Sequence, residues 1–396
     1  MPYIKNIYYN EPLIYLKGMK LSATNLKQFQ GKSINFLSGS SSFSLDTFDT
    51  FDKFKLIHED DRKIFEKIIN EIKSTNSFPS WWSEQESNYL GKISDKEKSI
   101  RYIIFRYKFR NFPLQRIVTD FPLYVLIEPV SACNLRCPFC FQVDPDFTRK
   151  PYTGIMDITL FKRVIDECEE NGTGAITLAS RGEPTLHPKF SEMLEYLSGK
   201  FFEVKMNTNG TKLTDEICHS IFKNKVNDVV LSIDTENKEL FESLRKNASF
   251  EDVLKNVQNL YNIRKEFYPE SDTAIRISGV YSSPEQDNKK FAEFWGRWAD
   301  EITISDAEER WDTYNNSIHP NLSTPCQYIW ERFYVWWDGA CNPCDVDYKS
   351  KLSPGALTES NSIKDIWHSE AHNLLRLNHE SGMRSGCFPC DRCGVS

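Results

Sequence analysis

The sequence lacks the features that would place this chain of 396 residues in a membrane or on nucleic acid. No run near its start is apolar and long enough for a signal peptide or a membrane span. Basic residues are not in excess, since 49 Lys and Arg stand against 56 Asp and Glu and give a net charge of -7. Such an acidic balance offers no footprint for nucleic acid. We therefore expect a cytoplasmic protein with neither a membrane nor a nucleic acid among its partners.

Cysteine is absent from residues 1–118 and concentrated further along the chain. Of the 11 cysteines, three lie at 133–140, six follow residue 325, and Cys168 and Cys218 stand alone. In a reducing compartment, grouped cysteines are expected to bind metal rather than to form disulfides. Cys168 and Cys218 fall within helical patterns, so we expect them to be buried core residues.

Residues 1–118 contain no motif that we can name, and we treat them as an N-terminal domain of unknown role. The stretch 64–72 has the pattern of an amphipathic helix. The stretch 100–112 is aromatic and basic, which favours a helix that packs an aromatic face, with a docking surface for a substrate or partner as the alternative. The length of the chain allows two to three domains.

From residue 121 onward, strand-like and helical patterns alternate. The predicted strands are 124–130, 175–179, 204–207, 229–233, 274–280 and 302–305. The predicted helices between them are 158–170, 189–197, 214–222, 250–267 and 286–298. This alternation predicts an α/β fold with a parallel sheet, whose active site lies at the carboxyl ends of the strands.

Three cysteines follow the first predicted strand at C-x3-C-x2-C spacing: Cys133, Cys137 and Cys140. Three thiolates on one short loop can share a site for a soft metal. A structural zinc ion generally takes four protein ligands, whereas three leave one iron of a four-iron cluster open. Zinc binding and chance clustering stay as alternative interpretations at this point.

This loop resembles the C-x3-C-x-aromatic-C signature of the radical S-adenosylmethionine (SAM) enzymes, with Phe139 at the aromatic position. The resemblance implies a partial (β/α)6 TIM-like barrel in which the three cysteines hold a [4Fe-4S] cluster and SAM binds its open iron. An electron from an external donor such as flavodoxin or ferredoxin would then cleave SAM to a 5′-deoxyadenosyl radical. That radical abstracts a hydrogen atom from the substrate.

Later loops carry the resemblance further. Residues 180–187 are similar to the family's G-G-E-P loop, with Arg181 in place of the first glycine, which implies that Glu183 holds the SAM amino group. Residues 207–210 and 232–235 look like the T-N-G turn and the S-x-D segment. Together they imply a SAM pocket lined by Phe139, Asn207, Asn209, Ser232 and Asp234. Arg276 either binds the SAM carboxylate or the substrate, or forms a structural ion pair.

The cysteines after residue 325 resemble the SPASM extension, or its shorter twitch form, of radical SAM enzymes. Cys326-x12-Gly339-x4-Cys344 meets the C-x(n)-G-x4-C pattern, and a C-x2-C-x2-C run ends the chain. We expect one auxiliary [4Fe-4S] cluster, with a structural zinc ion as the alternative. The predicted ligands are Cys326, Cys344, Cys390 and Cys393, with Cys387 as an alternate. Cys341 would then be spare, and we hypothesise that it donates hydrogen to a substrate radical.

The predicted organisation is an N-terminal domain at 1–118, a radical SAM core at 119–310 and a SPASM or twitch domain at 322–396. The resemblance implies a radical SAM oxidoreductase acting on a small-molecule or sugar-pathway substrate, with the auxiliary cluster assisting oxidation. The alternatives are a maturase or epimerase of a ribosomal peptide, and a non-catalytic zinc-binding interaction protein. Dehydrogenation, epimerisation and crosslinking are all compatible with these motifs.

Overall fold

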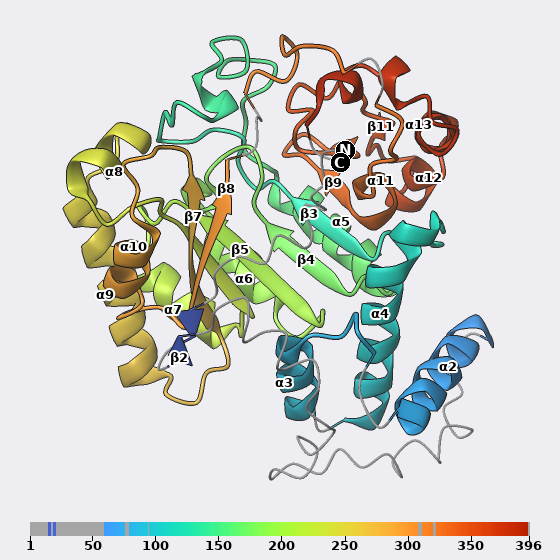
Figure 1. Cartoon of the computed structure of the whole chain (residues 1–396), viewed down its shortest axis with the longest axis horizontal. Coiled ribbons are helices and arrows are strands. Elements are labelled where there is room, and N and C mark those ends of the chain that lie inside the picture. Colours follow the sequence, from blue (N-terminus) through green and yellow to red (C-terminus); the bar gives the residue numbers. More distant parts are fainter. Residues whose placement is uncertain are drawn as a thin grey trace. The chain divides into compact units, whose positions relative to one another are not determined.

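The computed structural model describes Tyr15–Leu16, Met19–Lys20 and the ranges 59–75, 79–93, 95–307, 311–319 and 322–394. These residues form two compact units, which are described separately (Figure 1). The smaller holds the described residues between 59 and 118, and the larger holds the first two strands and everything described from Thr119 onward. None of the described helices is both long and apolar enough to cross a membrane.

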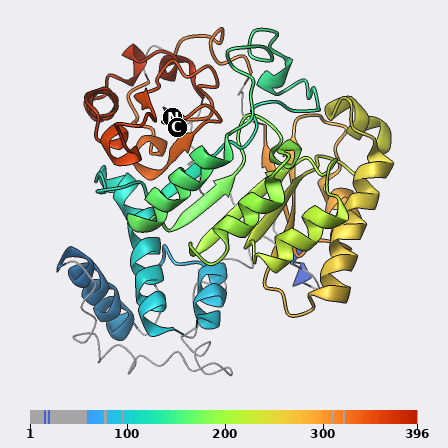
Figure 2. The same cartoon turned by 180° about the vertical axis from the view of Figure 1, so that it is seen from behind.

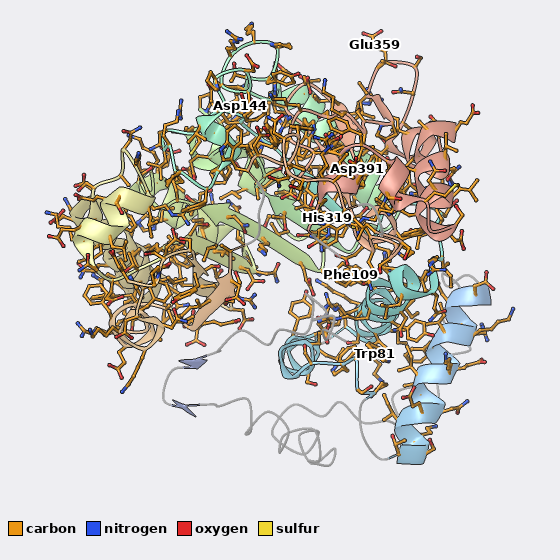
Figure 3. All side chains as sticks on the ribbon, turned by 45° about the horizontal axis from the view of Figure 1, so that its top comes forward. Trp81, Phe109, Asp144, His319, Glu359 and Asp391 are labelled. Atoms are coloured by element: carbon orange, nitrogen blue, oxygen red, sulfur yellow. The ribbon has the colours of Figure 1, made fainter. Side chains whose placement is uncertain are left out.

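The smaller unit consists of helices α2 (Glu59–Thr75), α3 (Glu84–Lys92) and α4 (Lys96–Gln115). The helix expected over 64–72 is confirmed, and the aromatic stretch 100–112 lies within α4. Trp81 and Phe109 mark this unit in Figure 3. The ring of Trp81 meets that of Tyr107 at 5.5 Å, and Arg106 forms a buried ion pair with Glu86. The aromatic side chains of the stretch therefore pack within this unit, as the structural interpretation expects, whereas Arg101 is exposed.

The larger unit is built on a parallel sheet that contains all six predicted strands. They are β3 (Tyr124–Ile127), β4 (Ala175–Leu178), β5 (Glu203–Thr208), β6 (Asp228–Ser232), β7 (Ala274–Tyr281) and β8 (Glu301–Asp306). Each pairs in parallel with the next along the chain, and the sheet stays open like part of a barrel. The predicted α/β fold is therefore confirmed.

The edges of this sheet are completed by segments from far along the chain. At one edge, β9 (Phe333–Val335) pairs in parallel with β3, and β10 (Ala340–Asn342) and β11 (Gly355–Ala356) follow in antiparallel fashion. At the other edge, β1 (Tyr15–Leu16) pairs antiparallel with β8 and with β2 (Met19–Lys20). The C-terminal segment thus continues the same sheet as the core, which the linear sequence did not predict.

Helices cover one face of the sheet (Figure 2). They are α5 (Ile158–Glu170), α6 (Phe190–Leu197), α7 (Asp215–Lys223), α8 (Lys238–Leu244), α9 (Phe250–Phe267) and α10 (Asn288–Trp295). Alternate strand residues such as Val204 and Met206 face this layer, and Lys205 and Asn207 point to the other side. The uncovered face therefore carries the polar side chains.

The C-terminal region contains α11 (Tyr328–Glu331), α12 (Ile363–Trp367), α13 (Glu370–Glu380) and the short 3-10 turns η5 (Arg384–Gly386) and η6 (Cys390–Arg392). A hairpin turn at Asp338–Gly339 connects β9 and β10, with φ of 84° at Gly339. The helices α12 and α13 are separate, although only two residues lie between them. The Ser369 side chain accepts a hydrogen bond from the backbone N–H of His372 and so starts a new helix.

Candidate active site

Cys133, Cys137 and Cys140 lie on the loop that leaves the carboxyl end of β3. The Leu135 N–H donates to Cys133 Sγ at 3.4 Å, and the Arg136 guanidinium donates to the Cys133 carbonyl at 2.7 Å. These contacts hold the loop in a tight turn around the first sulfur. The short 3-10 helix η3 (Phe141–Val143) begins directly after Cys140.

Of the thiols on this loop, Cys137 is buried and Cys133 and Cys140 are half-buried, and none of the three forms a disulfide. Burial raises the pKa of Cys133 to about 12, and Glu183, Cys140 and Cys137 also raise it. Burial likewise raises the pKa of Cys137. A buried group of thiols reaches its thiolate form when a metal replaces the protons. The donor set therefore fits the [4Fe-4S] cluster that the motif implies.

Glu183 joins the two loops that follow β4 and β5. Its carboxylate is 2% exposed and accepts hydrogen bonds from the Thr185 hydroxyl at 2.6 Å, the Thr208 hydroxyl at 2.7 Å and the Asn209 N–H at 2.7 Å. Burial raises its pKa, against the effect of these hydrogen bonds. The residue predicted to hold the SAM amino group is thus held rigidly beside the cysteine loop.

Asn209 and Asn207 approach the same place from the end of β5. The Asn209 side-chain amide donates to Cys133 Sγ at 3.7 Å and to Asn134 Oδ1 at 3.0 Å. The Oδ1 of Asn207 and the Oγ of Ser180 are buried and have no hydrogen-bond partner among the described residues. Buried polar atoms of this kind point to an absent ligand or water. They are where the polar groups of a bound SAM would be satisfied.

Asp234 holds an arginine against the cysteine loop. Its carboxylate is paired with Arg245, with Nε to Oδ2 at 2.6 Å and Nη2 to Oδ1 at 2.9 Å, and also accepts from the Val280 N–H at 3.0 Å. Arg245 Nη1 donates to Cys137 Sγ at 3.9 Å, and its guanidinium lies 5.4 Å from the ring centre of Phe139. Both oxygens of Asp234 are engaged, so this carboxylate positions Arg245.

Ser232 and Arg276 lie at opposite ends of their strands. Ser232 is the last residue of β6 and is half-buried at the edge of the sheet from which the cysteine loop leaves. Arg276 forms ion pairs of 3.1 Å with Asp228, the first residue of β6, and with Glu301, the first residue of β8. Parallel strands put these first residues at the amino end, away from the cysteine loop. The structural ion pair is therefore the alternative that the geometry supports for Arg276.

The structure places Cys341, proposed from the sequence as a hydrogen donor, inside the core. Its side chain is 0% exposed and lies in the core between the sheet and the helices. Phe333 and Val335 on the neighbouring strand belong to that core, whereas Tyr334 and Trp336 pack on the other face. Alternate residues of a strand point to opposite faces. The Cys341 thiol therefore faces the helices, and this placement gives no support to the hydrogen-donor hypothesis.

The C-terminal thiols influence one another's ionisation. Cys326, Cys344, Cys390 and Cys393 each affect, or are affected by, others in this set, and Cys387 also affects Cys390. Burial raises the pKa of Cys326 to about 11. The Cys387 thiol donates to the Met383 carbonyl at 3.7 Å. The predicted ligand set, with Cys387 as its alternate, stays a prediction. Among the described residues, no three His, Cys, Asp or Glu side chains are close enough to hold one metal ion.

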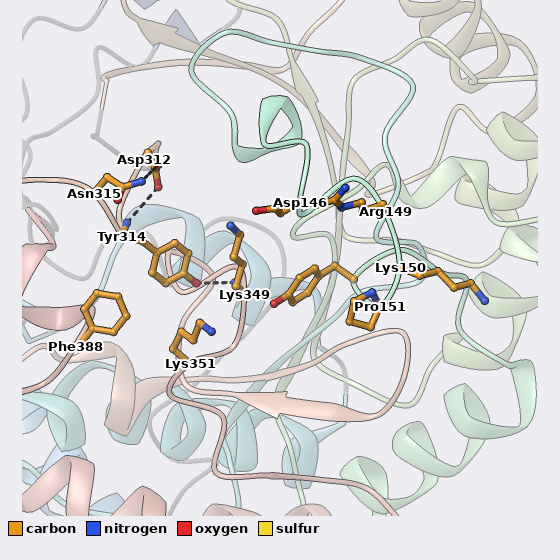
Figure 4. A pocket seen from close by; sticks show the side chains of 11 residues that line it. Asp146, Arg149, Lys150, Pro151, Asp312, Tyr314, Asn315, Lys349, Lys351 and Phe388 are labelled. Atoms are coloured by element: carbon orange, nitrogen blue, oxygen red, sulfur yellow. Dashed lines mark hydrogen bonds and ion pairs between the residues drawn. The ribbon is translucent and has the colours of Figure 1, made fainter.

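A pocket of about 510 Å³ opens between the loop after Cys140 and the C-terminal region (Figure 4). Its lining residues are Asp146, Arg149, Lys150, Pro151, Tyr152, Asp312, Tyr314, Asn315, Lys349, Lys351 and Phe388. The Tyr314 hydroxyl donates to Asp347 at 2.7 Å and accepts from the Lys349 N–H at 2.6 Å. Lys349 also forms an ion pair of 2.6 Å with Asp144. The pocket is therefore polar and charged, with aromatic walls.

Aromatic rings connect this pocket to both cysteine segments. Tyr348 stacks on Phe141, the residue after Cys140, at 4.9 Å, and meets Tyr314 at 4.9 Å. Tyr314 in turn meets Phe388 at 5.8 Å, and Phe388 lies between Cys387 and Cys390 in the chain. The pocket is thus connected through these rings to residues that neighbour Cys140 and Cys387 in the chain.

Sequence reasoning missed Arg245 and every residue of the pocket. Arg245 could have been suspected from its position, because it follows shortly after the S-x-D segment 232–234. The signal for the pocket was weaker: aromatic and charged residues at 146–152 directly follow the cysteine loop. Their partners at 312–315 and 349–351 are too distant in sequence to be matched without the fold.

Comparison with known proteins gives two family matches. Residues 127–294 match the radical SAM superfamily, and residues 326–394 match SPASM, an iron-sulfur cluster-binding domain. A mycofactocin maturase, MftC, of Mycolicibacterium smegmatis is 29% identical over 71% of this chain and 81% of the relative. A tungsten-containing aldehyde ferredoxin oxidoreductase cofactor-modifying protein of Pyrococcus furiosus is 35% identical over 28% of this chain and 30% of the relative.

Coverage differs among these relatives. The alignments span 30% and 38% of the first two curated relatives, about a third of their length. Among solved structures, Streptococcus suis SuiB bound to precursor peptide SuiA is 16% identical, with 79% of each chain covered and a TM-score of 0.49.

Proposed function

Because this chain belongs to the radical SAM superfamily and ends in a SPASM domain, we propose that it uses SAM to remove a hydrogen atom from a substrate held between the two domains. Cys133, Cys137 and Cys140 hold the [4Fe-4S] cluster, which supplies the electron that cleaves SAM to methionine and a 5′-deoxyadenosyl radical. Flavodoxin or ferredoxin is the proposed external electron donor.

The observation that carries this proposal is the pocket of about 510 Å³, whose ring contacts reach Phe141 beside Cys140 and Phe388 beside Cys387. A substrate there would give its hydrogen atom to the deoxyadenosyl radical. Cys326, Cys344, Cys390 and Cys393 would hold an auxiliary cluster, which would supply an acceptor for the second electron while a base takes the proton. The net change is a two-electron oxidation of the substrate, and 5′-deoxyadenosine leaves with the hydrogen.

SAM is held, in this proposal, by groups at the carboxyl ends of β3 to β6. Glu183 accepts a hydrogen bond from the SAM amino group, because an ammonium group only donates hydrogen bonds and a carboxylate accepts them. The buried, unpartnered oxygens of Ser180 and Asn207 supply further acceptors. Arg245 keeps a positive charge beside Cys137, where it stabilises the negative charge of the thiolate.

For the substrate, we propose a peptide. Its support is the maturase relative, which aligns over 71% of this chain and 81% of its own length. A pocket of about 510 Å³ accommodates one or two side chains of an extended segment. The second candidate is the small-molecule or sugar-pathway substrate that the sequence suggested. The pocket volume favours it, because small-molecule sites measure about 300–1,000 Å³.

Anaerobic reconstitution with iron and sulfide counting tests the proposal. The wild type should bind about eight irons and form 5′-deoxyadenosine with dithionite, whereas a Cys133/Cys137/Cys140→Ala variant should bind about four and form none. Transfer of deuterium into 5′-deoxyadenosine from labelled peptide or labelled low-mass extract would identify the substrate class. A protein that binds zinc, no iron and no SAM would instead support the non-catalytic interaction protein.

A further inference from the structure

Arg181 and Glu128 form a fully enclosed ion pair on the uncovered side of the sheet. Their side chains are 3% and 0% exposed. Arg181 Nε and Nη2 donate to the two carboxylate oxygens of Glu128, each at 2.6 Å. This is the bidentate geometry that only arginine provides. A buried charge that loses its partner costs much free energy, so each of these two side chains fixes the position of the other.

The pair is attached to the C-terminal region by three further contacts. Arg181 Nη1 donates to the Tyr348 carbonyl at 2.8 Å, and its guanidinium lies 4.1 Å from the ring centre of Trp336. The backbone N–H of Glu128 donates to the Val335 carbonyl at 3.0 Å. All the donor groups of this arginine therefore point to Glu128 or to the region that carries the SPASM match.

The backbone of Arg181 belongs to the loop that also carries Glu183. The Arg181 carbonyl and the Ser131 carbonyl both accept from Gln142 Nε2, at 2.5 Å and 2.7 Å. Two residues on, the Glu183 N–H donates to the Ala132 carbonyl at 3.0 Å. The loop is thus held against the segment that leads into Cys133, and the Arg181 side chain is its connection to the C-terminal region.

We propose that Arg181 is a positioning residue that joins the Glu183 loop and the C-terminal region into one rigid element. SAM affinity in this chain then depends on the docking of the C-terminal region. A glycine, which the G-G-E-P loop has at this place, makes none of these contacts. The part that concerns SAM rests on the proposed role of Glu183.

Arg181→Lys tests this in the reconstituted full-length enzyme. Lysine keeps the charge but lacks the planar fork with which Arg181 donates to both oxygens of Glu128 and to the Tyr348 carbonyl. We expect SAM binding, measured by equilibrium dialysis, to weaken roughly 10-fold, the effect typical of residues that orient a binding group. The iron count should not change. Without SAM, hydrogen exchange should accelerate both at 180–187 and at 335–348.

Arg264→Lys is the matched control. Arg264 also pairs with a carboxylate through two nitrogens, to Asp300, and donates to a carbonyl, that of Thr273 at 2.9 Å. The Arg264 side chain lies near the amino end of β7, because its partner Thr273 directly precedes that strand. This variant should change neither SAM affinity nor exchange in the two segments. An equal effect in Arg264→Lys would overturn the proposal, because general destabilisation would then explain both.

A second variant covers the case in which Arg181→Lys does not fold. Glu128→Leu with Arg181→Met removes the pair without leaving a buried charge, a replacement that proteins often tolerate. It should show the same weaker SAM binding and faster exchange. Wild-type values in either folded variant would refute the positioning role. Should the wild type bind no SAM, the proposed function fails, and the exchange of the two segments still decides whether Arg181 joins them.

Discussion

Gly182 should tolerate no side chain, and Gly182→Ala is therefore a sharp test of the site. A Cβ added there would lie 2.2 Å from the Val130 carbonyl oxygen and 2.5 Å from that of Ala132. Both atoms belong to the backbone that leads into Cys133, so neither can rotate away. A carbon–oxygen contact normally measures about 3.3 Å or more. The two backbone segments must then separate by roughly 1 Å.

The expected cost follows from this displacement. Overpacking of a tight interior costs about 1–3 kcal/mol. Separation also breaks the hydrogen bond of 3.0 Å from the Glu183 N–H to the Ala132 carbonyl, worth about 1 kcal/mol. The free energy of unfolding should therefore fall by about 2–4 kcal/mol. A shift of about 1 Å between Glu183 and the cysteine loop should slow SAM cleavage on the order of 100-fold.

Denaturant unfolding and the rate of 5′-deoxyadenosine formation under dithionite measure the two effects. Gly386→Ala is the matched control, because a Cβ there meets no atom within 4 Å and its φ is not in the left-handed region. It should leave both quantities close to wild type. If Gly182→Ala behaved like Gly386→Ala, the tight packing of the two loops would have no part in SAM cleavage.

Three further predictions follow from single contacts. Arg245→Gln removes the cation beside Cys137. The reduction potential of the first cluster should therefore fall, and SAM cleavage should slow roughly 10-fold. An unchanged potential in an EPR-monitored titration would contradict the tuning role. Cys390→Ala should leave about four irons and Cys387→Ala about eight, and the opposite result would reassign the auxiliary ligand. Cys341→Ala should lower the free energy of unfolding by about 1–2 kcal/mol through loss of core packing, with deuterium incorporation into product unchanged. A folded Cys341→Ala enzyme that no longer turned over would restore the hydrogen-donor hypothesis.

Much of the fold could be read from local pattern. The six parallel strands and five of the helices around them appear where hydrophobic periodicity predicted them, because each depends on residues that are neighbours in the chain. Periodicity could not reveal the break between α12 and α13, which depends on the cap that Ser369 supplies. It also could not reveal that β9 joins β3, since that pairing connects residues about 200 positions apart.

The same division holds for the candidate site. Cys133, Cys137 and Cys140 were found because their ligand spacing is local, and their loop follows a strand whose end was predictable. The roles of Arg276 and Cys341 stayed open, because the sequence does not show at which end of the sheet, or on which of its faces, a side chain lies.

Local motifs and periodicity in the chain indicate the superfamily, the cluster ligands proposed for the first site and the order of strands and helices. The folded chain alone reveals that Arg245 meets Cys137, that Arg181 meets Glu128 and Tyr348, and that residues from 146–152, 312–315 and 349–351 line one pocket. Spacing along a chain dictates which groups share a turn or a loop. Contacts between distant segments depend on strand pairing and packing, which only the folded chain establishes.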